Sequence, residues 1–196
     1  MNRFLLAVLM TANLAAPAHA EKHNIMHYWD IAFGKSDYQG FKDFQFTTKD
    51  VANGYLNFTA GFAGLIEMAL WREASGNDLV GIAEVHCDLD TTSLCSQSIA
   101  FYHFEGGRKI GVTEQVLPLN EVEAHYKEMA KEWKGKQTPN TIFDETLWYV
   151  IPQKGTAITV ALFINQNQPE GEAKITIGEL AWDKTKFVFR KKRPVF

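Results

Sequence analysis

Apolar and polar residues alternate along much of the chain with a period of two, the spacing typical of strands that bury one face. Two hairpins follow one another between residues 65 and 116. In the first, residues 65–72 pair with 79–87, and in the second, residues 98–104 pair with 109–116. Glycine-containing turns separate the strands of each pair, because glycine tolerates the backbone angles of tight turns. This stretch predicts a meandering antiparallel sheet.

The same alternation recurs on both sides of these hairpins. The further predicted strands cover residues 55–60, 146–151, 157–164, 173–182 and 186–190. The sequence therefore predicts about eight or nine strands.

One segment departs from this period and predicts an amphipathic helix. Asn120 is a suitable N-terminal cap, Gly135 is a suitable end, and His125 is assigned to the polar side. The apolar residues that share one helical face are Val122, Tyr126, Met129 and Trp133. Such a stripe is expected to pack on the sheet.

These elements predict a mainly β fold of the α+β class. We expect an antiparallel meander that forms a curved sheet, a sandwich or a small barrel, with one packed amphipathic helix. The alternative is a small, propeller-like array of hairpins, since strand–turn–strand units recur along the chain.

The first twenty residues predict a cleaved signal peptide rather than part of the fold. Arg3 precedes a short apolar run, and Ala18-His19-Ala20 is a small-residue cleavage site. The run is too short to cross a bilayer comfortably, and we expect no transmembrane segment. Residues 21–196 then form a single β-rich domain, exported to a periplasm or the extracellular space.

Charge narrows the range of partners. Of the 20 Lys and Arg residues, Arg3 lies in the predicted signal, which leaves 19 against 23 Asp and Glu residues and a net charge of −4. Such an acidic domain is a poor ligand for nucleic acid, so we expect none as a partner. The basic residues of the predicted C-terminal tail, 190–196, could make weak contact with an anionic surface: Arg190, Lys191, Lys192 and Arg193.

Both cysteines of the chain, Cys87 and Cys95, lie between the first two hairpins. In an exported chain two cysteines predict a disulfide. Closing so short a loop contributes roughly 2.5 kcal/mol to stability in the chain-entropy model. A bonded Cys87 cannot bind a metal together with the nearby His86, Asp88 and Asp90, so we expect neither a metal nor another cofactor.

The candidate site residues form no recognisable catalytic motif. Histidines and strand carboxylates could meet as a dispersed acid–base pair: His86, His103, Glu84 and Glu114. The aromatic-rich N-terminal arm, residues 21–45, has no clean period and predicts a loop-rich segment with at most a short helix or strand. Its rings are expected to pack against the sheet, and the alternative is a ligand-binding platform that includes Tyr28, Trp29 and Tyr38.

The absence of a catalytic motif favours a non-enzymatic, exported binding module that holds a protein partner or a small ligand on a β-sheet scaffold. One alternative is an exported hydrolase with a dispersed His and carboxylate site. The other is an accessory or structural protein of the cell envelope that uses the basic tail.

Overall fold

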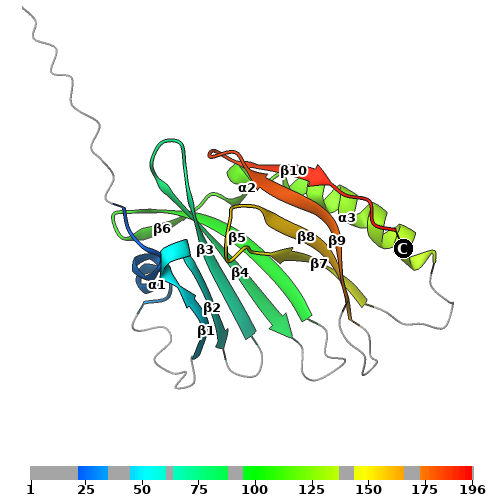
Figure 1. Ribbon diagram of the computed structural model, residues 1–196, viewed down its shortest axis with the longest axis horizontal. Helices are drawn as coiled ribbons and strands as arrows, with labels where there is room; N and C mark the ends of the chain where they lie inside the picture. Colours follow the sequence, from blue (N-terminus) through cyan, green and yellow to red (C-terminus); the bar gives the residue numbers. More distant parts are fainter. Residues whose placement is uncertain are drawn as a thin grey trace, which may run out of the picture.

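The protein is mainly β, as the sequence predicts (Figure 1). The computed structural model describes residues 22–34, 45–60, 64–87, 95–136, 144–165 and 173–195. Within these ranges two antiparallel sheets form, and they do not close into a barrel. The barrel and the propeller-like array are therefore wrong, because the hairpins join edge to edge into two sheets rather than into separate blades.

Sheet A contains six strands in the order of the chain. They are β1 (Gln45–Asp50), β2 (Tyr55–Ala60), β3 (Gly64–Arg72), β4 (Asp78–Cys87), β5 (Cys95–Glu105) and β6 (Arg108–Gly111). Sheet B contains four strands, again in chain order. They are β7 (Asp144–Val150), β8 (Ile158–Asn165), β9 (Ala173–Trp182) and β10 (Phe187–Lys191). The described residues thus form ten strands, of which β1 was not predicted from the sequence.

The helical elements are few and short. They are α1 (Ile25–Phe33), the 3₁₀ turn η1 (Val51–Asn53), α2 (Thr113–Val116) and α3 (Leu119–Lys134). None of these helices, within the part of the chain described, is long and apolar enough to span a membrane.

The two faces of sheet A bury alternate residues of the same strands, as a period of two requires. On β2 and β3, Leu56, Phe58 and Met68 pack with α1 in one apolar cluster. Residues of the opposite parity, among them Ala69 and Trp71, join the main core with sheet B. Sheet A is therefore covered on both faces.

Helix α1 is a short helix within the N-terminal arm, which was predicted to be loop-rich with at most a short helix or strand. Asn24 caps it, since its side-chain Oδ1 accepts hydrogen bonds from the backbone N–H groups of Met26 and His27 at 3.0 and 3.2 Å. The apolar residues of α1 pack on sheet A and supply the energy that holds the helix in place. The rest of the arm, residues 35–44, lies outside the described residues.

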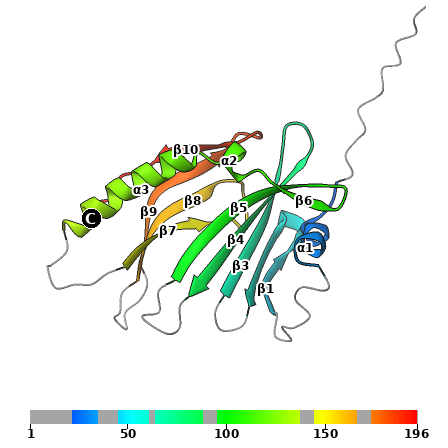
Figure 2. The same ribbon diagram turned by 180° about the vertical axis from the view of Figure 1, so that it is seen from behind.

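Helix α3 lies along sheet B, behind its strands in Figure 1 and in front of them in Figure 2. The predicted stripe is confirmed, because Val122, Met129 and Trp133 are buried in the main core and Tyr126 packs against it. Strand β8 is buried on both faces: its even-numbered residues join the main core, and Ala161 and Phe163 pack with Val85 of β4. Sheet B thus lies between α3 and sheet A.

The two sheets meet along β5 and β7 through side-chain hydrogen bonds, one of which the Thr146 hydroxyl donates to the Cys95 carbonyl oxygen at 3.4 Å. Strand β6 pairs only with the end of β5, from Tyr102 to Glu105. Beside the open part of β5, the Gln97 side chain donates a hydrogen bond from Nε2 to the Tyr149 carbonyl oxygen at 3.0 Å and accepts one at Oε1 from the Tyr149 N–H at 2.5 Å. The Gln97 amide therefore takes the place of a backbone partner for β7.

Two predicted boundaries are wrong. The strand expected over residues 109–116 ends at Gly111, and α2 follows, since the Thr113 hydroxyl accepts a hydrogen bond from the Phe101 N–H and turns the chain away from the sheet. The expected cap Asn120 lies inside α3, which begins at Leu119 after Pro118 without a side-chain cap. Proline fits there because it has no N–H to satisfy at a helix start.

His125 is buried, not on the polar side of the helix as expected. The residue is 1 % exposed, and its Nε2 lies 3.0 Å from the Ile177 carbonyl oxygen and 3.1 Å from that of Lys192. An imidazole N–H shared by two carbonyls fastens α3 to β9 and to the C-terminal segment. A polar residue within an apolar stripe is the reason that the sequence pattern misplaced it.

The predicted tail is not a free tail in the described residues. Arg190 and Lys191 belong to β10, and the Lys192 N–H donates a hydrogen bond to the Ile177 carbonyl oxygen at 2.8 Å. Arg190 and Lys192 both pair with Glu179, at 3.7 and 3.6 Å. Arg193 pairs with Glu128 of α3. The basic run is thus partly neutralised by the protein itself.

The predicted signal peptide, residues 1–20, lies outside the described residues. Cys87 and Cys95 are directly opposite each other in the register of β4 and β5. Facing residues of antiparallel strands have Cα atoms about 4.5–5.5 Å apart, which suits a disulfide. The side chain of Cys87 lies outside the described side chains, so the bond itself stays a prediction.

Replacing Gln97 with alanine removes both hydrogen bonds to Tyr149 and leaves a partly buried N–H and C=O unpaired. We expect the Gln97→Ala variant to lose about 1–3 kcal/mol of unfolding free energy. Urea denaturation measures the loss. Gln115→Ala, at an exposed position of α2, is the matched control and should lose almost nothing; equal stability of the two variants would contradict the bridging role of Gln97.

Candidate functional site

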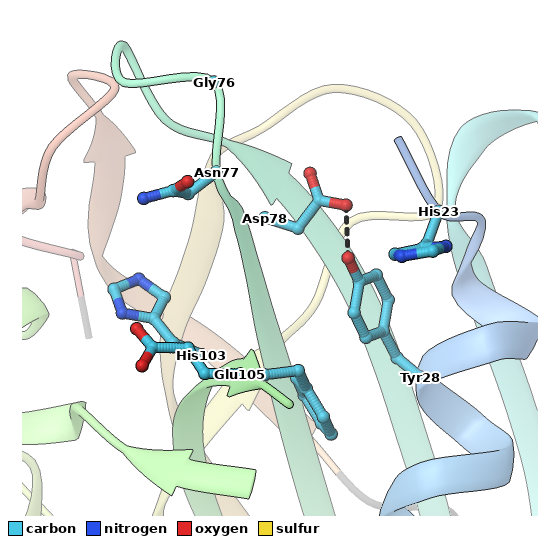
Figure 3. A pocket seen from close by; sticks show the side chains of 8 residues that line it. His23, Tyr28, Gly76, Asn77, Asp78, His103 and Glu105 are labelled. Carbon is cyan, nitrogen blue, oxygen red and sulfur yellow. Dashed lines mark hydrogen bonds between the residues drawn. The ribbon is translucent and has the colours of Figure 1, made fainter. Parts of the chain in front are cut away.

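A cavity of about 200 Å³ opens beside the turn that joins β3 to β4 (Figure 3). Its lining is largely polar and comes from α1, from this turn and from the end of β5: His23, Tyr28, Gly76, Asn77, Asp78, His103, Phe104 and Glu105. Two of the sequence candidates, Tyr28 and His103, therefore line one cavity although they are distant in the chain.

The β3–β4 turn, which forms one side of the cavity, is held by a glycine with positive φ and by backbone hydrogen bonds. Gly76 adopts a φ of +90°, which L side chains rarely adopt. The Glu73 N–H donates to the Asn77 carbonyl oxygen, and the Gly76 N–H donates to that of Glu73, both at 3.0 Å. The Ala74 N–H donates to the Lys184 carbonyl oxygen in the β9–β10 turn at 2.8 Å. The turn is thus tied to both sheets.

Asp78 is the centre of the first polar group in the cavity. Its side chain is 7 % exposed; it accepts a hydrogen bond from the Tyr28 hydroxyl at 2.5 Å and forms an ion pair with Arg72. Arg72 also donates to the His23 carbonyl oxygen at 2.9 Å. The guanidinium therefore compensates the buried carboxylate and fixes the chain just before α1.

Burial raises the pKa of the Tyr28 hydroxyl above its ordinary value, although the Arg72 guanidinium acts to lower it. The hydroxyl stays protonated near neutral pH and donates its hydrogen to Asp78. Tyr28 is thus suited to hold and orient a ligand rather than to remove a proton from one.

His103 is the centre of the second polar group. Its Nε2 lies 2.9 Å from Glu73 Oε1, and the Ser75 hydroxyl donates to Glu73 Oε2 at 3.0 Å. In a nucleophilic triad the histidine lies between the serine and the carboxylate. Here the Glu73 carboxylate lies between Ser75 and His103, so the Ser75 hydroxyl has no histidine beside it to accept its proton.

The other catalytic candidates do not gather at this cavity. His86 Nε2 lies 3.6 Å from Glu84 Oε2 in an exposed pair on β4. Glu114 lies on α2 and lines different cavities. In the β4–β5 register Glu84 lies opposite Ser98 and His86 opposite Ser96, so both share a face with the even-numbered residues of β5. His103 is on the other face of β5 and does not join them in one site.

The aromatic candidates also separate. Trp29 packs against Phe33, Phe46 and Phe58, with ring centroids 4.6, 5.2 and 4.2 Å away, and belongs to the cluster under α1. Tyr38 lies outside the described residues. Of the three predicted ligand-binding rings, only Tyr28 lines the cavity.

A second polar cluster lies between the sheets. The Tyr55 hydroxyl donates to Glu67 Oε1 at 2.6 Å, and Asn57 Nδ2 donates to the Tyr55 hydroxyl at 3.3 Å. Burial raises the pKa of Glu67, while the Tyr55 hydrogen bond and the Lys174 charge act to lower it. Burial also raises the pKa of Tyr55, and the hydrogen bond to Glu67 adds to that rise. Asn57 Oδ1 is buried without a hydrogen-bond partner among the described atoms.

No three His, Cys, Asp or Glu side chains group as metal ligands in the described ranges. Asp88 and Asp90, considered with His86 and Cys87 as possible ligands, lie outside those ranges. Arg72, Glu73 and Asp78 were not among the candidates predicted from the sequence. Their charge and their position could have singled them out, since all three lie at the ends of a predicted hairpin, where side chains from both strands and the turn converge.

No family model, curated protein or solved structure matches this chain. Its function has to be inferred from the geometry of these groups.

The Glu67 pKa makes a prediction about stability. The Glu67 carboxyl binds its proton more tightly in the folded state, so its protonation stabilises the fold. This stabilisation is fully present below about pH 4.5, the ordinary pKa of the group. It is lost as the pH rises through the folded-state pKa. Glu67→Gln stays neutral throughout. We expect the unfolding free energy of the unaltered protein, relative to this variant, to fall as the pH rises above 4.5.

Urea denaturation across a pH series measures this difference. Glu84→Gln, at a half-exposed position of β4, is the control for the exchange of Glu for Gln. A Glu67→Gln difference that stays constant with pH, or that has the opposite slope, would contradict the burial of a carboxyl group with a raised pKa.

Proposed function

We propose that this protein is an exported, non-enzymatic binding module that holds a small polar ligand in the cavity between α1, the β3–β4 turn and β5. The observation that carries the proposal is the preorganised lining: Tyr28 and Arg72 both engage Asp78, and Glu73 holds His103. Polar groups fixed before a ligand arrives lower the entropic cost of binding it.

The size and chemistry of the cavity narrow the ligand class. At about 200 Å³ it is smaller than the roughly 300–1,000 Å³ of pockets for drug-sized molecules, so it suits a compact molecule. The rings of Tyr28 and Phe104, whose centroids lie 4.9 Å apart, offer an apolar wall. His23, Asn77 and Glu105 offer hydrogen-bonding groups on the other sides. A monosaccharide, an amino acid or a small amine fits this description.

A hydrolase is the second candidate, and one observation favours it. His103 and Glu73 form the hydrogen-bonded His–carboxylate pair that general acid–base catalysis uses. The order of Ser75, Glu73 and His103 argues against a serine nucleophile, so a hydrolase would need a water molecule activated by His103. An envelope-associated role for the basic residues is a weaker candidate, since Arg190, Lys192 and Arg193 pair with the protein's own carboxylates.

A ligand panel with matched variants tests the binding proposal. Glucose, arginine, glutamate and spermidine are added to the protein while its melting temperature is followed. A compound at 100 times its Kd should add about 2.7 kcal/mol of stability. Tyr28→Phe should reduce the shift strongly, because the cavity loses the Tyr28 hydroxyl and Asp78 keeps only its ion pair with Arg72 to orient it.

Tyr102→Phe, on β5 in the cluster under α1, is the control and should keep the shift. An unchanged shift in Tyr28→Phe would remove the cavity as the site. Turnover of ester or glycoside substrates that His103→Gln abolishes would instead favour the hydrolase.

Export into an oxidising compartment is the second part of the proposal, and the facing positions of Cys87 and Cys95 support it. The purified mature chain should lack free thiols and gain the mass of two hydrogen atoms on reduction. Cys95→Ser should lower the unfolding free energy by roughly 2.5 kcal/mol. Two titratable thiols in protein recovered from a periplasm or culture medium would contradict the disulfide.

A further inference from the structure

The first residues of the expected mature chain carry a compact set of nitrogen donors. Cleavage after Ala20 makes Glu21-Lys22-His23 the new N-terminus, with a histidine in the third position. The donors are the α-amino nitrogen of Glu21, the backbone nitrogens of Lys22 and His23, and Nδ1 of His23. Because short covalent links join each donor to the next, all of them can close fused chelate rings around one ion. A square plane of nitrogen ligands suits Cu(II) or Ni(II).

The described part of this segment leaves its donor nitrogens available. Lys22 and His23 precede α1, and Asn24 caps that helix. Among the described residues, no hydrogen bond engages the backbone N–H of Lys22 or of His23. Neither residue is a proline, so each has an amide proton that a metal ion can displace. The segment can therefore bind an ion without unwinding α1.

One contact anchors the segment without using a donor nitrogen. The Arg72 guanidinium donates a hydrogen bond to the His23 carbonyl oxygen at 2.9 Å and is itself paired with Asp78. The His23 side chain lies just before α1 (Figure 3) and is partly exposed, and Lys22 is exposed. An ion can thus reach both residues from solvent, and the anchor is compatible with a metal on the nitrogen atoms.

His27 is the neighbouring histidine and lies outside the motif. Its ring stacks on that of His23, with centroids 3.7 Å apart and an angle of 17° between the planes. An imidazole binds a metal through a lone pair in the plane of its ring. Two nearly parallel, stacked rings do not direct their lone pairs at one ion, so the pair is not a two-histidine site. A search for clustered side-chain ligands in the described ranges does not find the motif, because most of its donors belong to the backbone.

We propose that cleavage of the predicted signal peptide creates a Cu(II) site at the N-terminus, with the Glu21 amine, the Lys22 and His23 amide nitrogens and His23 Nδ1 as ligands. The inference rests on the export proposed above and goes beyond it, because it requires the chain to begin at Glu21. Among the divalent first-row ions, Cu(II) binds nitrogen donors most tightly. Binding displaces a proton of the α-ammonium group and both amide protons, and the imidazole binds in its neutral form. The oxidation state of the ion does not change.

A Cu(II) titration of the full mature chain tests the proposal. The chain is prepared with Glu21 as its first residue, and Cu(II) is added in competition with nitrilotriacetate. The matched control is the same chain with one glycine added before Glu21. This control keeps every side chain, including His23 in the small cavity, but moves the histidine out of the third position. Loss of a residue that only supports a metal ligand costs roughly 10–100-fold in affinity, so disruption of the ligand set should weaken Cu(II) binding about 100-fold or more.

Two substitutions separate the motif from the neighbouring histidine. His23→Ala should weaken Cu(II) binding as strongly as the added glycine does, whereas His27→Ala should bind Cu(II) like the unaltered chain. Electron paramagnetic resonance of the Glu21 chain should show Cu(II) coupled to nitrogen ligands in a square plane. A pH-stat should record the release of about three protons per bound ion. Urea denaturation shows that each variant is folded.

Equal Cu(II) affinity with and without the added glycine would overturn the proposal. So would a loss of binding in His27→Ala that matches the loss in His23→Ala. Either result leaves export and the small-ligand cavity standing.

The N-terminus of protein recovered from a periplasm or culture medium provides the second test. Glu21 as the first residue supports the site. Any other first residue removes the site although export is correct, and a chain that stays uncleaved inside the cell contradicts both.

Discussion

The architecture depends on how β5 changes partners along its length. Its end pairs with β6 and its beginning lies beside β7, where the Gln97 amide replaces a missing backbone partner. An amide side chain can do this because it carries one acceptor and two donors in the same plane, as a peptide group presents an acceptor and a donor. The joint lets the chain leave sheet A, form α2 and α3, and return as sheet B against the same core.

A second set of bonds fastens the end of the molecule where the small cavity lies. The Trp182 indole N–H donates to the Arg72 carbonyl oxygen at 3.1 Å, and that of Trp71 donates to the Thr156 carbonyl oxygen at 2.8 Å. Together with the bond between Ala74 and Lys184, these contacts tie the β3–β4 turn to sheet B. Polar groups of a binding site keep their positions in the absence of ligand better when hydrogen bonds to the rest of the protein hold the turn that carries them.

The sequence predicted most of the fold because the strands follow a period of two and the stripe of α3 follows a period of 3.6. It missed β1, whose Gln-Phe-Thr-Thr-Lys-Asp run has no apolar alternation, and it misplaced His125, whose ring is buried through bonds to distant carbonyls. The candidate site was predicted only in Tyr28 and His103. Their partners Asp78 and Glu73 become partners through tertiary contact, which local spacing cannot express.

The same physics explains why the chemistry of this chain is hard to infer from its pattern. Sheet A is covered by α1 on one face and by the main core on the other, and β8 is buried on both faces. The apolar periodicity of the sequence identifies these buried faces. It therefore gives no information about the surfaces that a ligand can reach. What is left for recognition is the end of a hairpin, where charged residues from both strands and the turn meet around a cavity. Such a cluster has no periodic signature, because it forms where the regular alternation of the strands ends.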